Sequence, residues 1–246
     1  KKRNDENAEH FKGEMLKTCN LSLYVRKREQ SGGKGMGGFK FEQCGNIEGL
    51  YLVEPQVFSD ERGYNLEAYH AGSFRDAGLD MVFVQDNLSM SAKGTLRGMH
   101  FQKNYQQGKL VCVVSGEVFD AVVDIRDGSR TYGQWFGTVL SAVKKNMLYV
   151  PEGFAHGFLV LSDTAVFSYK LSDYYHPEDE SGIPWNDETI GIRWPIPKDM
   201  TILTSERDSR HPAFGEGSAL KPKKNRKTME ATVHANVMDE TSRGRI

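Results

Sequence analysis

The sequence predicts an all-β domain, a β-sandwich or barrel with few short helices. Short apolar runs rich in β-branched and aromatic residues recur through the middle of the chain, separated by Gly, Pro and Asp turns. Two of these breaks, Ser115-Gly116 and Ser162-Asp163, are two-residue hairpin signals. No long amphipathic helical pattern competes with them, so alternating strand–helix units around a parallel sheet are not expected.

The expected elements follow in chain order. A first strand covers residues 50–53 and is interrupted by Pro55, and a turn follows at residues 60–63. Ser73 is the expected N-cap of a single helical turn over residues 73–77. Further strands are predicted at residues 81–87, 94–102, 109–114, 117–126, 135–143, 147–150, 156–161 and 165–171. Residues 172–214 are rich in Tyr, Trp and Pro, which indicates an ordered irregular cover.

Composition divides the chain into three parts. Residues 1–46 are polar and Gly-interrupted and are expected to form an N-terminal extension, with a short helix conceivable at residues 11–28. Residues 47–214 form the predicted β domain. Residues 215–246 are polar and poor in aromatics, so a disordered C-terminal tail is expected there.

Charge and cysteine content narrow the functional classes. The net charge is −1, but residues 1–35 carry a net +4 and residues 215–246 a net +3, which leaves −8 for residues 36–214. A nucleic-acid partner is therefore not expected, because its basic patch would lie on the folded body. No apolar run reaches the length of a membrane span. The three cysteines form no CxxC pair, which favours a reducing cytoplasm.

The stretch Gly94–Gln102 carries the first chemical signal, because it places Arg97 and His100 three residues apart on an expected strand. Regular alternation would put these two side chains on opposite faces. A bend at Gly98 could bring Arg97 to the edge of the site that His100 faces.

A metal site is the obvious first hypothesis for His100. The chain resembles the cupin β-barrels at two places, because Gly94 and His100 open a G-x5-H-x-H-x3,4-E motif and residues 151–156 match P-x-G-x-x-H. This resemblance implies a cupin-like jelly roll. Gln102, however, stands where the second histidine belongs, and Gln106 and Gln107 occupy the acidic position. Two histidines are too few for a divalent metal, so neither a metal nor another cofactor is expected.

Without a metal, the polar groups of the predicted inner wall need another partner. A single inward-facing histidine is commonly a hydrogen-bonded core residue. A purely structural role is harder to assign to four such groups together, namely His100, His156, Arg97 and Lys109. Buried cations must be paired or face a ligand. The planar fork of arginine suits a phosphate, so an anionic substrate is expected.

Several longer motifs resemble one family closely. Their order and spacing are similar to those of the dTDP-4-dehydrorhamnose 3,5-epimerase family. The resemblance runs from about residue 47 to residue 212 and does not include either tail. The motifs are Asp60-Glu61-Arg62-Gly63, Phe83-Val84-Gln85-Asp86-Asn87, residues 96–102, Gly108-Lys109-Leu110, Val123-Asp124-Ile125-Arg126, residues 151–158, Tyr169-Lys170 and Trp185-Asn186-Asp187.

The resemblance implies an isomerase that needs no cofactor. Its substrate would be a dTDP-4-keto-6-deoxyhexose, in deoxysugar biosynthesis of the dTDP-L-rhamnose type. The protons on C3 and C5 both neighbour the C4 ketone, so removing either one gives an enolate. Such chemistry requires a base on one face, a proton donor on the other and a positive group at the enolate oxygen.

The catalytic roles are carried over residue by residue. By resemblance His100 is the base, and Asp208 of the Ser205-Glu206-Arg207-Asp208 motif is its partner, although Asp208 by itself would pass for an exposed loop acid. Tyr169 matches the proton donor, and its simpler interpretation is a half-buried strand tyrosine. Lys109 is similar to the lysine that steadies the enolate oxygen.

The resemblance also implies substrate-binding residues and a dimer. Positions that hold the nucleotide or sugar are matched by Arg62, Glu67, Gln85, Asn87 and Arg97, while His156 lines the sugar pocket and Tyr174 matches an aromatic that stacks on thymine. Part of this set crosses a dimer interface in the family, so a homodimer is expected. The sequence departs from the family at residues 64–66, where aromatic residues are common.

Three alternatives stay open at this point. A single-carbon epimerase acting at C3 or C5 for another deoxysugar would share the His–Asp–Tyr set. A non-catalytic sugar-nucleotide-binding β-sandwich would need the arginines but not His100, Asp208 and Tyr169 together. A metal-dependent cupin oxygenase or isomerase would need a stoichiometric transition metal.

Overall fold

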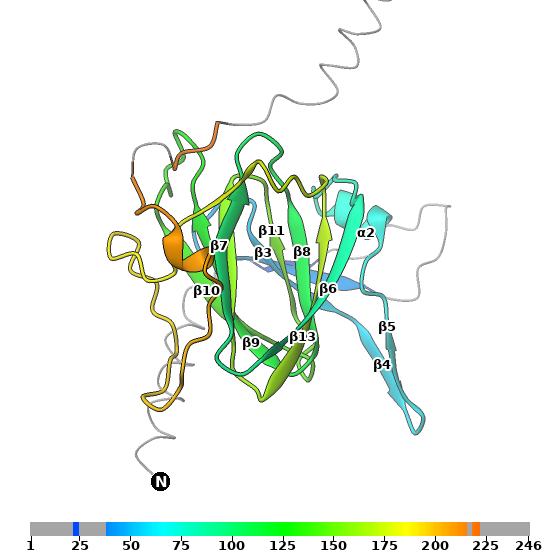
Figure 1. The fold of residues 1–246 in the computed structure, drawn as a ribbon. Coiled ribbons are helices and arrows are strands. Elements are labelled where there is room, and N and C mark those ends of the chain that lie inside the picture. Colours follow the sequence, from blue (N-terminus) through cyan, green and yellow to red (C-terminus); the bar gives the residue numbers. More distant parts are fainter. Residues whose placement is uncertain (1–21, 25–37, 216–217, 222–246) are drawn as a thin grey trace, which may run out of the picture.

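The computed structural model describes residues 22–24, 38–215 and 218–221, and these form an almost entirely β structure in which two antiparallel sheets face each other (Figure 1). The seven-stranded sheet has the order β1 (Ser22–Tyr24), β2 (Phe39–Gln43), β3 (Tyr51–Pro55), β11 (Met147–Val150), β8 (Lys109–Ser115), β13 (Thr164–Leu171) and β6 (Gln85–Ala92). The five-stranded sheet has the order β10 (Trp135–Ser141), β9 (Glu117–Asp124), β12 (Phe154–Val160), β7 (Leu96–Gln102) and β14 (Glu180–Gly182). The predicted all-β, cupin-like jelly roll is confirmed.

The main core fills the space between the two sheets and flanks the polar wall residues, because Val118 and Val122 lie two residues to either side of Asp120 on β9. Val111 and Leu148 of the seven-stranded sheet meet Val122 and Phe158 of the five-stranded sheet in this cluster. Apolar side chains of this kind each contribute about 1.5–3 kcal/mol when fully buried. The core therefore fixes the separation of the sheets and, with it, the width of the space that the polar residues face.

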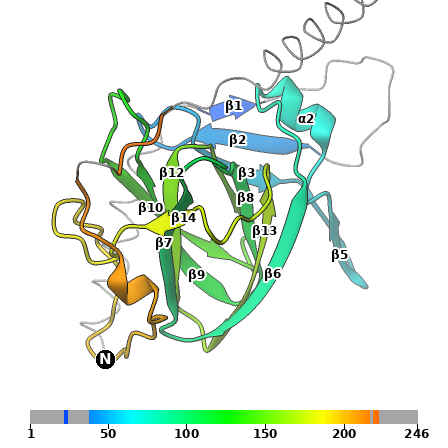
Figure 2. The same ribbon diagram turned by 45° about the horizontal axis from the view of Figure 1, so that its top comes forward.

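The outer face of the five-stranded sheet is also covered. Strand β9 is buried on both faces, and its outward residues Phe119 and Val123 pack in a second cluster with Trp185, Trp194 and Leu220 from the irregular segment that follows β14. The predicted irregular cover is thus present. It also carries the chain back toward β7, where the 3-10 helix η1 (Asp208–Arg210) lies beside that strand (Figure 2).

The packed chain extends beyond residues 47–214 at both ends. Phe39 and Phe41 of β2 are buried against Phe74, although residues 39–43 were assigned to the extension. Their alternating pattern is only one short strand long and follows directly on a Gly-rich run, which hid it. At the other end Leu220 is buried and pairs with Arg126, so the packed chain extends past residue 214.

Other local predictions need smaller corrections. Residues 22–24 form strand β1 rather than part of a helix over residues 11–28, whose other residues lie outside the described ranges. Residues 81–84 precede β6 instead of belonging to it. The helix α2 (Ala71–Asp76) is capped by His70, whose Nδ1 accepts a hydrogen bond from the Ser73 N–H at 3.2 Å, so Ser73 lies inside the helix.

A two-stranded arm, β4 (Val57–Asp60) with β5 (Gly63–Leu66), projects from the body (Figure 1). All four residues of β4 and the first three of β5 are exposed. In the part of the chain that the structure describes, no helix combines the length and apolar character that a membrane span requires.

Candidate active site

A cavity of about 580 Å³ lies between the two sheets and is lined by strands of both. Strand β6 alternates between two environments, because Asn87 and Ser89 line the cavity while Leu88 and Met90 are exposed on the opposite face. Further polar side chains come from β7, β8, β12, β13, β14, the segment between β13 and β14 and the segment that contains η1. They include Arg97, His100, Lys109, His156, Tyr169, Tyr175, Glu180, Arg207 and Asp208.

A β-bulge brings Arg97 and His100 to the same cavity. His156 of β12 pairs with His100, but Phe158 pairs with Arg97, so three steps along β7 oppose two steps along β12. The extra residue shifts the alternation of side chains. Gly98 has a φ of 118°, and a Cβ there would lie 2.7 Å from the backbone of residues 156–157. The bend predicted at Gly98 is present, and it needs glycine.

His100 and Asp208 form the expected pair across more than a hundred residues. His100 Nε2 donates to Asp208 Oδ1 at 2.7 Å, and the N–H of Gly98 donates to the other carboxylate oxygen at 3.2 Å. Burial would raise the pKa of Asp208, but His100, the neighbouring His211 and the Gly98 N–H together hold that pKa well below its usual range. Asp208 is therefore an anion that fixes the orientation of the His100 ring and leaves His100 Nδ1 toward the cavity.

His211 completes this cluster and was not identified from the sequence. Its ring lies edge-on to the His100 ring, with centroids 5.7 Å apart, and His211 Nε2 is 3.8 Å from Asp208 Oδ1. Gly182 of β14 makes room for it, because a Cβ on Gly182 would lie 2.4 Å from the His211 ring. A histidine three residues after the acid was the available sequence signal.

A second carboxylate approaches His100 from β14. Glu180 Oε1 is 3.8 Å from His100 Nδ1, and only 10% of the Glu180 side chain is exposed. Glu180 Oε2 pairs with Arg207 at 2.5 Å and accepts a short hydrogen bond from the Tyr175 hydroxyl. Sequence reasoning missed these three residues, because they come from irregular segments and from a strand of only three residues.

His156 has a different environment from His100. Its Nε2 lies 2.9–3.0 Å from both carboxylate oxygens of Asp120, which is fully buried in β9. Burial raises the pKa of Asp120, and His156 and Lys109 oppose this shift. His156 lines the cavity as predicted, but the Asp120 contact occupies one of its ring nitrogens.

Lys109 and Tyr169 stand on the seven-stranded sheet, across the cavity from the histidines. Burial lowers the pKa of Lys109 to about 8, although the negative charges of Glu180 and Asp120 raise it. Lys109 therefore remains mostly cationic at neutral pH. Tyr169 lies on β13 next to Asn87 in the strand pairing, and both line the cavity.

The predicted nucleotide-binding residues divide into two groups. Asn87 and Arg97 line the cavity, and Gln85 supports Asn87 by donating a hydrogen bond to its Oδ1 at 3.0 Å. Tyr174 is 59% exposed and does not line the cavity, whereas Tyr175 does. The role of Tyr174 therefore stays a prediction, and its neighbour Tyr175 is a second aromatic candidate, in the irregular segment after β13 ends at Leu171.

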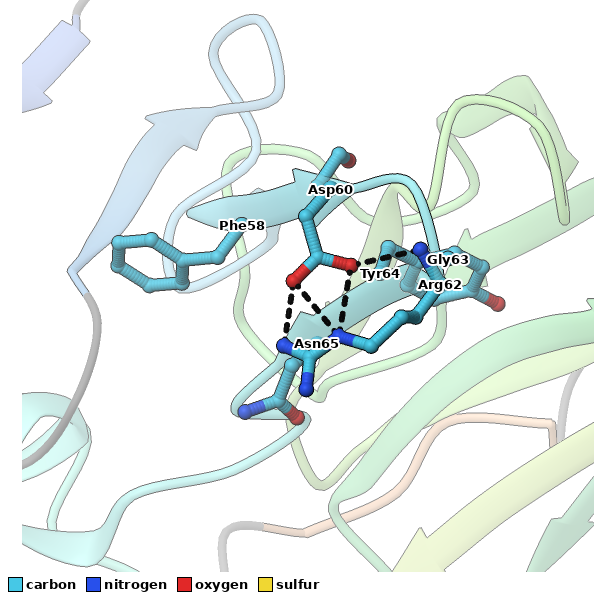
Figure 3. Close-up of a pocket in the computed structure, with 7 residues that line it drawn as sticks. Phe58, Asp60, Arg62, Gly63, Tyr64 and Asn65 are labelled. Carbon is cyan, nitrogen blue, oxygen red and sulfur yellow. Dashed lines mark hydrogen bonds and ion pairs between the residues drawn. The ribbon is translucent and has the colours of Figure 1, made fainter.

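Arg62 and Glu67 are not brought to the cavity of the same chain. Arg62 lies at the tip of the arm, where its guanidinium bonds to Asp60 and 85% of its side chain is exposed (Figure 3). A shallow hollow of about 520 Å³ surrounds it and is lined only by arm residues, including Phe58, Tyr64 and Asn65. Glu67 follows the arm and is half-buried there.

The donor set of a cupin metal site is not available in this cavity. Gln102 is buried and its amide is fully used, donating to the carbonyls of Tyr105 and Tyr174 and accepting from the His176 N–H. Ligating atoms of His100, Asp208 and His211 do lie within 4.8 Å of one another. Ligands of a tetrahedral zinc ion stand about 3.3 Å apart. The 2.7 Å bond between His100 and Asp208 would have to open to admit an ion.

Comparisons with known proteins agree with this geometry. The family model of dTDP-4-dehydrorhamnose 3,5-epimerase matches residues 45–216. A dTDP-4-dehydrorhamnose 3,5-epimerase of Methanothermobacter thermautotrophicus is 49% identical over 173 residues, covering 70% of this chain and 93% of that protein.

Two solved structures are similar in fold and sequence. A dTDP-6-deoxy-D-glucose-3,5-epimerase from Legionella pneumophila, in complex with dTDP-4-keto-L-rhamnose, matches with a TM-score of 0.71 and 41% identity, covering 76% of this chain and 100% of that one. A 3'-monoepimerase from Streptomyces bikiniensis, in complex with dTDP-quinovose, matches with a TM-score of 0.67 and 33% identity, covering 77% and 96%. On its sequence and its fold, this chain belongs to the dTDP-4-dehydrorhamnose 3,5-epimerase family.

Proposed function

We propose that this protein inverts C3 and C5 of a dTDP-4-keto-6-deoxyhexose through enolate intermediates. The observation that carries the proposal is the His100–Asp208 pair, which faces Lys109 and Tyr169 across one cavity. Family membership supports the same reaction.

His100 acts as the base through Nδ1. Asp208 accepts a hydrogen bond from the Nε2–H group, which fixes the tautomer of His100. The same carboxylate stabilises the imidazolium that forms when Nδ1 takes a proton from carbon. A positioned general base of this kind contributes about 10²–10⁴-fold to the rate.

Lys109 and Tyr169 complete the reaction from the opposite wall. A cationic ammonium in a cavity sheltered from water stabilises the negative charge that develops on the C4 oxygen. The Tyr169 hydroxyl delivers a proton to the face opposite His100, which inverts the carbon.

The diphosphate would be held by the guanidinium groups at the cavity. Arg97 of β7 donates to Ser91 Oγ of β6 at 3.1 Å, which holds its side chain toward the opposite sheet, and Arg207 lines the same cavity from the η1 segment. Two planar guanidinium groups suit the paired phosphates of a nucleoside diphosphate. Tyr174, which is exposed, and Tyr175, which lines the cavity, each offer an aromatic face for the thymine ring.

A homodimer belongs to the proposal and is supported by two surfaces. Leu88, Met90 and Val114 are more than half exposed on the outer face of the seven-stranded sheet. The adjoining arm carries Arg62 away from its own cavity. A second copy seated on this face would cover the apolar side chains and receive the arm. Light scattering should report a dimer, and Met90→Glu should shift it toward the monomer; a monomeric wild type would contradict this part.

The location is proposed to be the cytoplasm. Cys44 and Cys112 are both free thiols, and Cys44 is buried. Such cysteine usage is typical of a reducing compartment.

The decisive experiment is turnover of the 4-keto sugar nucleotide in deuterated water. Deuterium should enter at both C3 and C5, because each inversion replaces a carbon-bound proton with one from solvent. Label at one carbon only would favour a single-carbon epimerase, for which the 3'-monoepimerase fold is the structural precedent. Label at neither carbon would favour a non-catalytic binding protein.

A further inference from the structure

If His100 is the base for both inversions, it must be deprotonated between them, and the His100–Asp208 pair alone offers no route for that proton. After the first abstraction His100 is an imidazolium, and it must lose that proton before it can act at the second carbon. Asp208 holds its charge firmly and accepts from Nε2, so it is a poor route for the proton taken up on Nδ1. The following inference rests on the proposed function and concerns this missing step.

Glu180 is placed to receive the proton. Strand β14 pairs with β7 so that Gly182 opposes His100 and Glu180 opposes Gln102, which puts the Glu180 side chain on the same face as His100, one diagonal step along the sheet. Its Oε1 is 3.8 Å from His100 Nδ1, the nitrogen that Asp208 leaves unoccupied. A small side-chain rotation would bring these two atoms within hydrogen-bond distance.

Glu180 also connects the cavity with the outside. It lines the catalytic cavity on one side and, on the other, a more open hollow of about 430 Å³ formed with Ser181, Glu206 and Arg210. Arg207 lines both spaces as well, and it pairs with Glu180 Oε2. A carboxylate in the wall between the reacting groups and solvent has the position that a proton relay requires.

We propose that Glu180 is a proton relay that resets His100 between the two inversions. The Nδ1–H bond of the His100 imidazolium breaks and an O–H bond forms on Glu180 Oε1, which regenerates neutral His100 and gives a neutral carboxylic acid. That acid then releases its proton to water or a buffer base in the outer hollow. Release of that proton restores the charged pair of Glu180 and Arg207 that the structure shows.

The test is Glu180→Gln in the full chain, with turnover of the 4-keto sugar nucleotide in deuterated water. Glutamine has the shape of glutamate but cannot carry the proton. The first exchange should change by less than about threefold, whereas the second should slow at least about tenfold, so that a singly labelled, singly inverted product accumulates. Glu180→Ala should recover its second exchange when formate is added as a diffusible base.

The matched control is Glu206→Gln, since Glu206 lies on the same hollow but is exposed and pairs with Arg210. It should leave the ratio of the two exchange rates unchanged. If Glu180→Gln slows both exchanges by the same factor, or leaves both unchanged while the wild type labels C3 and C5, the relay is wrong and the proposed function stands. A wild type that labels fewer than two carbons overturns the proposed function itself.

Discussion

Charged residues of the cavity and of the β4–β5 arm differ in how far along the chain their ion-pair partners lie. In the cavity, partners come from distant parts of the chain: His100 bonds to Asp208, and His156 bonds to Asp120. On the arm, Arg62 bonds only to Asp60, two residues away, and most of its side chain is in water. Long-range pairing fixes the cavity geometry within one chain, whereas the Arg62 guanidinium has no ion pair beyond the arm among the residues that the structure describes.

This contrast separates two kinds of contribution to function. The proposed base, its partner, the cation and the proposed proton donor all line one cavity of a single chain. The arm supplies an exposed cation and exposed aromatic side chains, which suit a neighbouring molecule. Changes to His100, Lys109 and Tyr169 should therefore act on the chemical step, and changes on the arm should act on binding.

The largest expected effect is that of His100→Ala. Loss of the base should lower kcat by about 10³-fold or more and abolish deuterium exchange, while dTDP still binds. Exchange kinetics and a dTDP titration on the same preparation test both statements. Normal exchange in this variant would contradict the catalytic role and favour a binding module.

Tyr169→Phe should have a narrower effect within the same cavity. The ring stays in place on β13, but the hydroxyl needed for the second proton transfer is gone. We expect abstraction to continue, seen as wash-in of deuterium, while completed inversion falls by about 10²-fold. Nuclear magnetic resonance of the product separates exchange from inversion. A normal product at a normal rate would rule out Tyr169 as the donor.

The pH dependence should follow the ammonium of Lys109. Its pKa is lowered to about 8, so the stabilising cation is present below that pH and is lost as the pH rises through it. We expect kcat/KM to fall on the alkaline side of about pH 8, and Lys109→Met to be slow at every pH without that limb. Lys170→Met is the matched control, because Lys170 pairs with Asp86 outside the cavity. An alkaline limb that persists in Lys109→Met must come from another group.

The smallest effect in this series is expected from the arm. Arg62→Ala should raise KM about tenfold, the size of a lost charge-assisted hydrogen bond, while kcat and the melting temperature stay nearly constant. Arg75→Ala on α2 removes another exposed arginine and should change neither constant. A large fall in kcat for Arg62→Ala would mean that the arm acts in the chemical step and would remove the distinction between the two regions.

Much of the fold was predictable because it depends on short-range sequence patterns. Strands β8, β9, β11 and β13 follow from apolar runs and turn residues, and their predicted limits agree with the structure within about two residues. The strands that were predicted incorrectly also have physical explanations. Strand β2 is short and follows a Gly-rich run, and β6 begins four residues later than the apolar pattern of residues 81–84 indicated.

The site divides in the same way. Family motifs pointed to His100, Lys109, Tyr169 and Asp208, and all four line the cavity. Tyr175, Glu180 and His211 lie in irregular segments or on a strand of three residues, where no periodicity tells which side chain turns inward. Their positions depend on how the cover returns to β7, which no local pattern encodes.

The sequence by itself determined the β class, the strand series, the glycine that bends β7 and the residue types that the chemistry needs. Propensity, turn residues and periodicity act over a few neighbours, so they can be read directly from the chain. Only the tertiary structure decided that Asp208 reaches His100, that Glu180 faces the base from the cavity wall, and that Arg62 points away from its own cavity. These relations depend on the packing of segments up to about a hundred residues apart, and packing is a property of the whole fold.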